Sequence, residues 1–189
     1  MTKNEKKQKL RELYLKDIST LNHTKPSYSE YEQFVPGEGS PDAPILFIGE
    51  APGETESKLA RPFVGKSGQL LRSLLKELAF DPADYFITNI VKWRPPKNRT
   101  PTSQEIMFCF NTYLEEEIAI IKPRIICTLG ASALRSIYPL APSVTTARGK
   151  MIDYNGTHLL PTIHPAYAIY DPEQKKFLRQ DLLSLKKYC

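Results

Sequence analysis

Three side chains that could do chemistry stand at or near the ends of short apolar segments: Glu50, Asn89 and His164. These segments have the length and composition of buried strands. Because the carboxyl ends of parallel strands meet at one edge of a sheet, we expect a carboxylate, an amide and an imidazole to converge there. Phe63 lies in the loop after the first of these segments and can add an aromatic ring.

This combination of side chains suits the cleavage of an N-glycosidic bond. The amide of Asn89 offers a donor and an acceptor side by side, which matches the imide edge of a pyrimidine. The ring of Phe63 gives such a base a stacking face. His164 can donate a hydrogen bond to a carbonyl oxygen on which negative charge develops, and Glu50 can position water or stabilise a cationic sugar.

Each of these residues also has a simpler structural interpretation. Asn89 could satisfy backbone groups at the end of a strand, and His164 could be a structural residue of a loop. Phe63 could belong to the core, while Glu50 and Glu56 could be solvated acids of a turn-rich loop. The residues taken one by one leave these alternatives open.

A loop at residues 92–101 carries four basic residues and three prolines but no acid. The whole chain has 26 Lys and Arg against 21 Asp and Glu, a net charge of +5. This charge favours a polyanionic partner without proving one. Together with the side chains above, it predicts a base flipped out of DNA as the substrate. The loop residues expected to contact phosphates, and so to make DNA affinity fall steeply with salt, are Lys92, Arg94, Lys97 and Arg99.

The rest of the composition argues against several classes of protein. Cys109, Cys127 and Cys189 lie far apart, which disfavours a disulfide framework and an all-cysteine metal site. His23 and His158 have no partners at metal-ligand spacing. No apolar run approaches the roughly 20 residues of a membrane span, and the charged N-terminus is not a secretory signal. We therefore expect no metal, no membrane and a cytoplasmic protein that meets the genome.

Strands and helices alternate along the chain, which is typical of an α/β domain. This order favours a mainly parallel sheet covered on both faces, in a single domain of residues 1–189. Residues 1–44 are expected to form a helix and an extended lead-in packed on that domain, and residues 139–157 to be irregular. The apolar runs predict strands at 45–49, 85–91, 125–130 and 159–163, and the helical patterns predict helices at 4–22, 67–79, 102–121, 131–138 and 172–187.

At these residues the chain resembles the family 4 uracil-DNA glycosylases. The resemblance covers about four-fifths of the chain, in order and without large gaps, and the ordered set is far more specific than any one piece. The matching segments are Gly37-Glu38-Gly39, Gly49-Glu50-Ala51-Pro52-Gly53, Arg61-Pro62-Phe63-Val64-Gly65, Thr88-Asn89, Arg94-Pro95-Pro96, Asn98-Arg99-Thr100-Pro101, Lys122-Pro123, Leu129-Gly130 and His164-Pro165-Ala166-Tyr167.

The resemblance implies a three-layer αβα sandwich with a central four-stranded parallel sheet. It also implies removal of uracil from DNA, leaving an abasic site in base-excision repair. By position, Glu50 matches a catalytically important acid of the water-activating loop, Asn89 the uracil-reading amide and His164 the histidine aimed at uracil O2. The substrate-binding residues implied in the same way are Ala51, Gly53, Glu56 beside the pyrimidine C5 edge, the stacking Phe63 and Asn89.

The segment after His164 is where the family inserts into the duplex and fills the space of the extruded nucleotide. Unstacking a base costs a few kcal/mol, so a wedge should offset it. The family often has Leu-Leu-Arg where this chain has Ala168-Ile169-Tyr170, which puts one phosphate contact in doubt. The residues expected to contact DNA here are Ala166, Tyr167 and Ile169.

Family members usually hold a four-iron cluster on four cysteines, and this chain departs from that pattern. Residues 1–108 contain no cysteine, and Trp93 stands at the third ligand position. Phe110 falls at the fourth, with Cys109 one residue off register. One thiol cannot hold a cluster that takes four. We therefore expect no cofactor, with a 4Fe-4S cluster as the disfavoured alternative, and apolar packing by Trp93, Phe110 and tyrosines of the lead-in.

Two alternatives remain within the resemblance. The chain could excise another deaminated base, or it could be a catalytically silent DNA-binding or interaction protein of the same fold. An unrelated nucleotide-binding module ranks last, because the glycine-rich loop lacks a phosphate-binding lysine. The chain also lacks the insert of relatives that trap uracil covalently, so we expect turnover, by a monomer acting on DNA that contains uracil.

Overall fold

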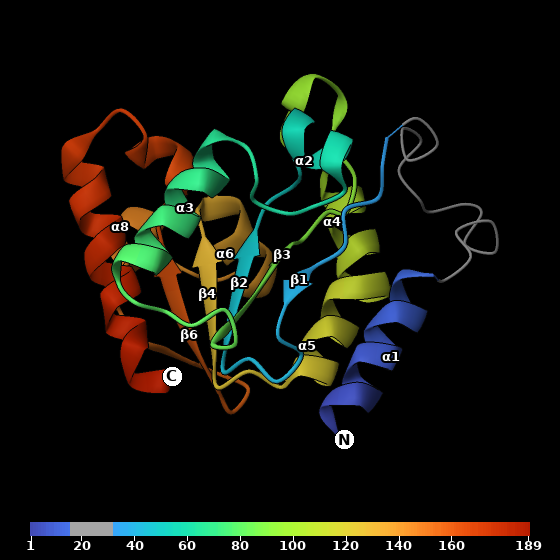
Figure 1. Ribbon diagram of the computed structural model, residues 1–189. Coiled ribbons are helices and arrows are strands. Elements are labelled where there is room, and N and C mark those ends of the chain that lie inside the picture. Colours follow the sequence, from blue (N-terminus) through green and yellow to red (C-terminus); the bar gives the residue numbers. More distant parts are fainter. Residues whose placement is uncertain (16–31) are drawn as a thin grey trace.

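The computed structural model describes residues 1–15 and 32–189. A six-stranded sheet in the order β1-β3-β2-β4-β6-β5 forms its centre (Figure 1). The strands are β1 (Glu38–Gly39), β2 (Ile45–Gly49), β3 (Tyr85–Asn89), β4 (Ile125–Leu129), β5 (Ile152–Tyr154) and β6 (Thr157–Thr162).

The four central strands β3, β2, β4 and β6 are parallel. All residues of β2 and β4 are buried, as expected for parallel strands covered on both faces. The predicted four-stranded parallel sheet is therefore confirmed as the centre of a larger sheet. Gly49 pairs with Asn89, so the ends of β2 and β3 lie at the same level.

Both edges of the sheet carry a short antiparallel strand that the sequence analysis did not predict. β1 pairs with β3. β5 pairs with β6 through a tight turn at Asn155-Gly156, whose φ angles of 50° and 78° suit a two-residue hairpin. The prediction that residues 139–157 are irregular is wrong at β5 and also at the short helix α7 (Val144–Ala147).

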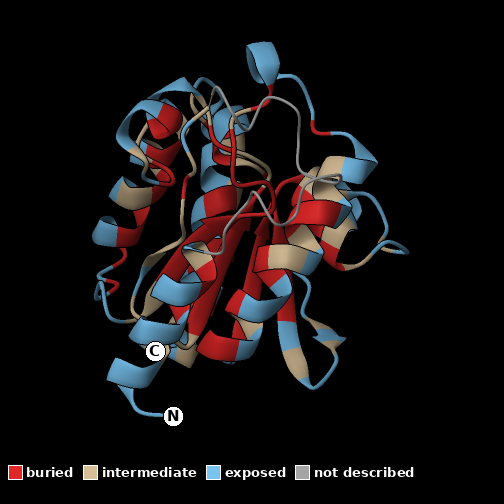
Figure 2. Cartoon of the chain, turned by 90° about the vertical axis from the view of Figure 1, so that its right-hand side faces the viewer, coloured by how far each residue is buried: buried red, intermediate tan, exposed pale blue. Residues whose placement is uncertain are grey.

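Helices cover both faces of the sheet, so the chain forms three layers. Helices α3 and α8 pack on one face through Leu71, Leu74 and Leu178. Helices α1, α4, α5 and α6 lie over the other face (Figure 1). Figure 2 shows the red, buried strands between helices whose outer sides are exposed. The helices are α1 (Lys3–Tyr14), α2 (Glu54–Leu59), α3 (Lys66–Glu77), α4 (Ser103–Cys109), α5 (Glu115–Ile121), α6 (Ala131–Ile137) and α8 (Pro172–Ser184), with short 3-10 turns η3 (Pro96–Asn98), η5 (Pro165–Ala168) and η6 (Leu185–Tyr188).

One long helix predicted at residues 102–121 contains a π-helical turn, η4 (Phe110–Leu114), between α4 and α5.

The N-terminal helix α1 starts at a capping box formed by Thr2 and Glu5. The rest of the predicted helix 4–22, with Ile18, and residues 23–31 of the lead-in lie largely outside the described residues.

In the part of the chain that the structure describes, no helix has the length and apolar character needed to cross a membrane.

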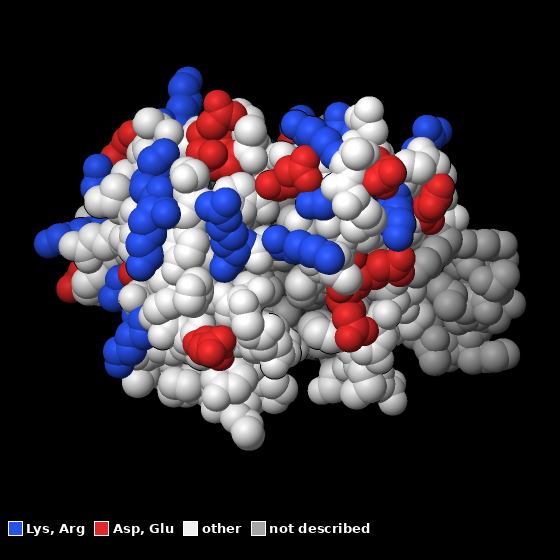
Figure 3. All heavy atoms as spheres, turned by 90° about the horizontal axis from the view of Figure 1, so that it is seen from below, with Lys and Arg blue, Asp and Glu red and all other residues white. Residues whose placement is uncertain are grey.

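The edge of the sheet at the amino ends of the parallel strands is seen from below in Figure 3, where basic and acidic side chains are interspersed. The opposite edge, at the carboxyl ends, holds the cavity described next.

Candidate active site

A cavity of about 400 Å³ opens at the carboxyl ends of β2 and β3. The structure brings Glu50, Phe63, Asn89 and His164 together around it. Four segments far apart in the sequence therefore meet at one pocket, as the order of strands and loops predicts. The other lining residues are Ala51, Pro52, Gly53, Glu56, Ser67, Pro95, Asn98, Arg99 and Ala166.

Asn89, the last residue of β3, places its amide in the wall of this cavity. The side chain is buried, and its Oδ1 has no hydrogen-bond partner among the described residues. A buried acceptor without a partner is costly unless a ligand satisfies it. Gly49 on the neighbouring strand makes this arrangement possible, because an added Cβ would lie 2.4 Å from Asn89 Oδ1 and 2.5 Å from Phe63 Cζ.

Phe63 is held in an unusual backbone conformation beside Asn89 and His164. Its φ is +53°, in the left-handed region that non-glycine residues rarely adopt. Its ring is buried, and the ring centroid lies 6.2 Å from that of His164. Gly68 allows the turn, because a Cβ there would lie 2.0 Å from the Phe63 carbonyl carbon. The ring therefore faces the pocket because the surrounding contacts enforce it.

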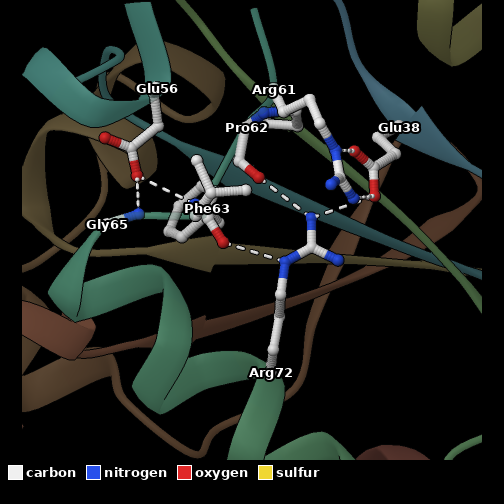
Figure 4. A network of polar contacts seen from close by, with 8 residues as sticks. Glu38, Glu56, Arg61, Pro62, Phe63, Gly65 and Arg72 are labelled. Atoms are coloured by element: carbon white, nitrogen blue, oxygen red, sulfur yellow. Dashed lines mark hydrogen bonds and ion pairs between the residues drawn. The ribbon is translucent and has the colours of Figure 1, made fainter. Parts of the chain in front are cut away.

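A clamp of charged residues holds the Phe63 loop from outside the pocket (Figure 4). Arg72, on α3, donates to the carbonyl oxygens of Pro62 (2.9 Å) and Phe63 (2.8 Å). It also contacts Glu38 on β1 at 3.2 Å, and Arg61 binds Glu38 through two nitrogens at 2.8 and 2.9 Å. The hydrogen bond from Arg61 lowers the pKa of Glu38 despite its partial burial. The sequence analysis missed this clamp, although Glu38 lies in one of its matching segments.

Glu56 anchors the other side of the same loop. Its Oε1 accepts hydrogen bonds from the backbone N–H groups of Val64 (2.9 Å) and Gly65 (2.7 Å), at the start of α3. A carboxylate at a helix N-terminus is favoured by the exposed N–H groups and by the helix dipole. Glu56 is buried and lines the cavity, so it is not a solvated loop acid.

His164 follows β6 and presents a neutral imidazole to the cavity. Burial lowers its pKa to about 4, although the charge of Glu56 opposes this shift. Its Nδ1 accepts a hydrogen bond from the backbone N–H of Ala166 at 3.2 Å. Nδ1 is therefore the unprotonated nitrogen, and Nε2 carries the hydrogen that can be donated.

Glu50 lies between this cavity and a second one. The second cavity, of about 800 Å³, is also lined by His164, Ala166 and Tyr167. The Glu50 carbonyl accepts a hydrogen bond from Val91 N–H at 3.0 Å, which ties the loop after β2 to the segment after β3. Its carboxylate forms no ion pair with the residues that the structure describes.

The comparisons with known proteins agree with this geometry. The family model described as the Uracil DNA glycosylase superfamily matches residues 36–186. The chain belongs to this superfamily. A type-4 uracil-DNA glycosylase of Sulfurisphaera tokodaii is 44% identical over 162 residues, covering 81% of this chain and 73% of the relative. One of Thermotoga maritima is 40% identical over 167 residues, 86% of each chain. A DNA polymerase of Bacillus phage SP01 is 35% identical over 147 residues, 77% of this chain but 16% of the polymerase.

The basic loop of this glycosylase-family chain differs from the prediction. Lys92 is fully buried and bound to Glu117 at 2.8 Å, so the prediction that it contacts DNA is wrong. Arg94 donates to Asn98 and lies 3.5 Å from Glu54, and Arg99 binds both oxygens of Glu105. Lys97 is exposed in a left-handed turn. The burial of Lys92 could not be predicted from the sequence, because its partner Glu117 lies 25 residues away along the chain.

The segment after His164 presents aromatic side chains at the surface beside the cavity. Ala166 is exposed and lines the pocket, and Tyr167 next to it is 74% exposed. Ile169 is half-buried, and Tyr170 is 83% exposed. Exposed tyrosines beside a pocket are suited to stacking against bases.

The third and fourth ligand positions implied by the resemblance, Trp93 and Phe110, carry no thiol that could bind an iron–sulfur cluster. Trp93 is buried, and its ring lies 5.1 Å from Phe34 and 5.9 Å from Tyr113. Cys109 is buried beside them, and burial raises the pKa of its thiol to about 12, which opposes the thiolate that iron needs. Within the described ranges no group of His, Cys, Asp and Glu is arranged to hold a metal ion. Phe110 packs against the same core cluster as Trp93 and also lines a small cavity with Ile118 and Tyr154.

Proposed function

We propose that this chain excises uracil from DNA by hydrolysing the N-glycosidic bond and leaving an abasic site. The observation that carries this proposal is the meeting of Glu50, Phe63, Asn89 and His164 around one cavity of about 400 Å³. A buried amide, a ring, a neutral imidazole and a carboxylate are the groups that such a reaction needs. The relatives named type-4 uracil-DNA glycosylases support the same activity.

In this proposal each side chain acts on one part of the flipped nucleotide. The amide of Asn89 pairs with the imide edge of uracil while Phe63 stacks on its face. As the C1′–N1 bond breaks, the electron pair leaves with the base, and Nε2–H of His164 donates to uracil O2, where negative charge develops. The Glu50 carboxylate stabilises the cationic sugar, positions the water that adds to C1′ and takes up the proton that this water releases. Glu56 limits the space beside C5.

Incubation with DNA that contains a single uracil, followed by alkali, tests the activity. Strand breaks at the uracil are expected, and their absence would overturn the proposal. Oligonucleotides with hypoxanthine or with a thymine mismatch, added as competing substrates, test the base range. Faster cleavage at either one would assign the chain to another lesion.

We propose that Tyr167 is the side chain that enters the duplex, with Ala166 and Ile169 beside the gap. Its exposure next to the cavity supports this choice over the half-buried Ile169. Arg94, Lys97 and Arg99 remain the proposed phosphate contacts. We propose that the protein acts as a monomer on the genome, inside the cell. Because Arg94 and Arg99 already face acids, binding DNA must weaken those ion pairs.

We also propose that the protein works without an iron–sulfur cluster. The aromatic rings of Phe34 and Tyr113 pack on Trp93, which stands at the third ligand position implied by the resemblance. Protein purified without air is expected to show no visible absorption band and no bound iron. A band together with iron and labile sulfide would contradict this proposal.

Replacement of Arg72 by methionine is expected to slow uracil excision about tenfold. The change removes both donors that hold the Pro62 and Phe63 carbonyls, so the strained loop is free to relax and the ring moves. Single-turnover kinetics measures the effect. Arg179→Met, which breaks an exposed pair with Glu77, is the matched control and should leave the rate unchanged. Equal rates for both variants would show that the clamp does not position Phe63.

The pKa of His164 near 4 predicts the pH dependence of this protein. The folded imidazole stays neutral from pH 8 to about pH 5, so the single-turnover rate should show no step near pH 6.5 from His164. The unfolded chain takes up this proton below about pH 6.5. The free energy of unfolding therefore loses the His164 contribution progressively between about pH 6.5 and pH 4. Urea unfolding at pH 7 and pH 5 should show a larger loss for the wild type than for His164→Ala.

A further inference from the structure

A fully buried ion pair lies directly behind the amide that reads the base. Lys92 Nζ donates to both carboxylate oxygens of Glu117 at 2.8 Å. It also donates to Thr88 Oγ1 at 2.6 Å and to the Asn89 carbonyl oxygen at 2.9 Å. Neither charged side chain of the pair has any exposed surface. The ammonium group therefore connects α5 to the last two residues of β3.

Such a pair is not explained by stability alone. Removing two charges from water carries a desolvation cost that their attraction often fails to exceed, and apolar replacements of similar volume can be as stable. A buried pair can instead fix a local arrangement. This pair contacts Asn89. The arrangement that it fixes is therefore expected to be that of the Asn89 peptide.

The side chain of Asn89 cannot hold itself in place. Its Oδ1 has no hydrogen-bond partner in the described part of the chain. The direction of the amide therefore depends on the backbone of Asn89 and on its packing beside Gly49 and Phe63. On one side, Ile90 N–H donates to the Gly49 carbonyl at 2.9 Å, and on the other the Asn89 carbonyl accepts from Lys92.

The same network reaches the segment that clamps the stacking ring. Tyr14, on α1, donates its hydroxyl hydrogen to Glu117 Oε1 at 2.6 Å, and its oxygen accepts from Gly37 N–H at 3.2 Å. Gly37 precedes Glu38, which holds Arg72 and, through it, the Phe63 loop. Helices α1 and α5 lie side by side (Figure 1), so the connection from Glu117 on α5 to Tyr14 on α1 is direct. Asn89 and the Phe63 loop, which form two walls of the base pocket, are thus both connected to the Lys92–Glu117 pair. The connection to Asn89 is a direct hydrogen bond, and the connection to Phe63 runs through Tyr14, the segment Gly37-Glu38 and Arg72.

We propose that Lys92 and Glu117 are positioning residues for uracil excision, which set the peptide of Asn89 so that its amide meets the imide edge of the base. This inference rests on the proposed function. It assigns to Lys92 a role in reading the base, in place of the phosphate contact expected from the sequence.

The double variant Lys92→Met/Glu117→Gln tests this role. It removes both charges, while the glutamine can still accept from Tyr14 and Thr88. We expect it to fold and to melt close to the wild type, because no unpaired charge is buried. The single-turnover rate should fall about 30-fold. The inhibition constant of free uracil should rise by a similar factor, with unchanged affinity for DNA that carries an abasic-site analogue.

Leu185→Ala is the control, because it destabilises the core from the last turn, η6, where Lys186 and Tyr188 contact Ala79 and His158 away from the cavity. Measured below its melting temperature, it should keep the wild-type rate and uracil inhibition. A double variant with wild-type rate and uracil inhibition would overturn this inference alone. An inactive wild type would overturn the proposed function, and this inference with it. If the double variant does not fold, Thr88→Val, which removes one acceptor of Lys92, should lower the rate about threefold, and an unchanged rate would overturn the inference.

Discussion

Replacing Asn89 by alanine is expected to lower the single-turnover rate of uracil excision about 1,000-fold without lowering the melting temperature. A site built to hydrogen-bond its substrate loses discrimination steeply when the partner group is removed. The stability prediction has a separate reason. Asn89 Oδ1 is buried and has no hydrogen-bond partner within residues 1–15 and 32–189, so its removal takes away an unsatisfied polar atom. Groups of this kind are kept for function at a cost in stability.

Two measurements separate these effects. Single-turnover kinetics with uracil-containing DNA gives the rate, and thermal unfolding gives the melting temperature. Asn111→Ala, at an exposed position of the π-helical turn, is the matched control and should change neither. A large fall in the melting temperature of Asn89→Ala would mean that the amide supports the fold. A rate within tenfold of the wild type would mean that another group reads the base.

The convergence of the site could be predicted because it depends on simple rules. Apolar runs located the four parallel strands, and parallel strands end at one edge. Glu50, Asn89 and His164 stand at or just after such ends, and the cavity lies among them. Phe63 was placed less securely, since its position depends on a strained backbone held by Arg72 and Glu56. Contacts of that kind leave no periodic signal in the sequence.

The errors have equally specific causes. Lys92 was taken for a surface residue because charged side chains are rarely buried, and its pairing with Glu117 depends on how α5 packs on β3. Phe110 was expected to share the apolar packing of Trp93, and it does pack on the same core cluster, but the rings nearest Trp93 are those of Phe34, Tyr113 and Phe108. The π turn that starts at Phe110 shifts which residues of the helix face the core. Strand β5 was missed although Asn155-Gly156 is a strong hairpin signal.

Replacing His164 by alanine is expected to lower the single-turnover rate about 100-fold to 1,000-fold, the usual effect of removing one donor to a developing oxyanion. The donor is the Nε2–H of a neutral ring, because Nδ1 accepts from Ala166 N–H and burial lowers the pKa to about 4. A neutral donor helps most when charge accumulates on uracil O2 in the transition state. Binding of DNA without the base should therefore change little.

The matched control for this variant is His158→Ala. His158 lies near the exposed start of β6, the strand that His164 follows. Its ring centroid lies 5.6 Å from that of Tyr188, away from the cavity. It should keep the full rate. The two variants together with the affinity for abasic-site DNA distinguish chemistry from binding. If His164→Ala lost affinity and kept its rate, the histidine would hold the DNA. If it lost rate alone, the imidazole would act on the departing base, and the low pKa would explain why the enzyme needs no protonated histidine to do so.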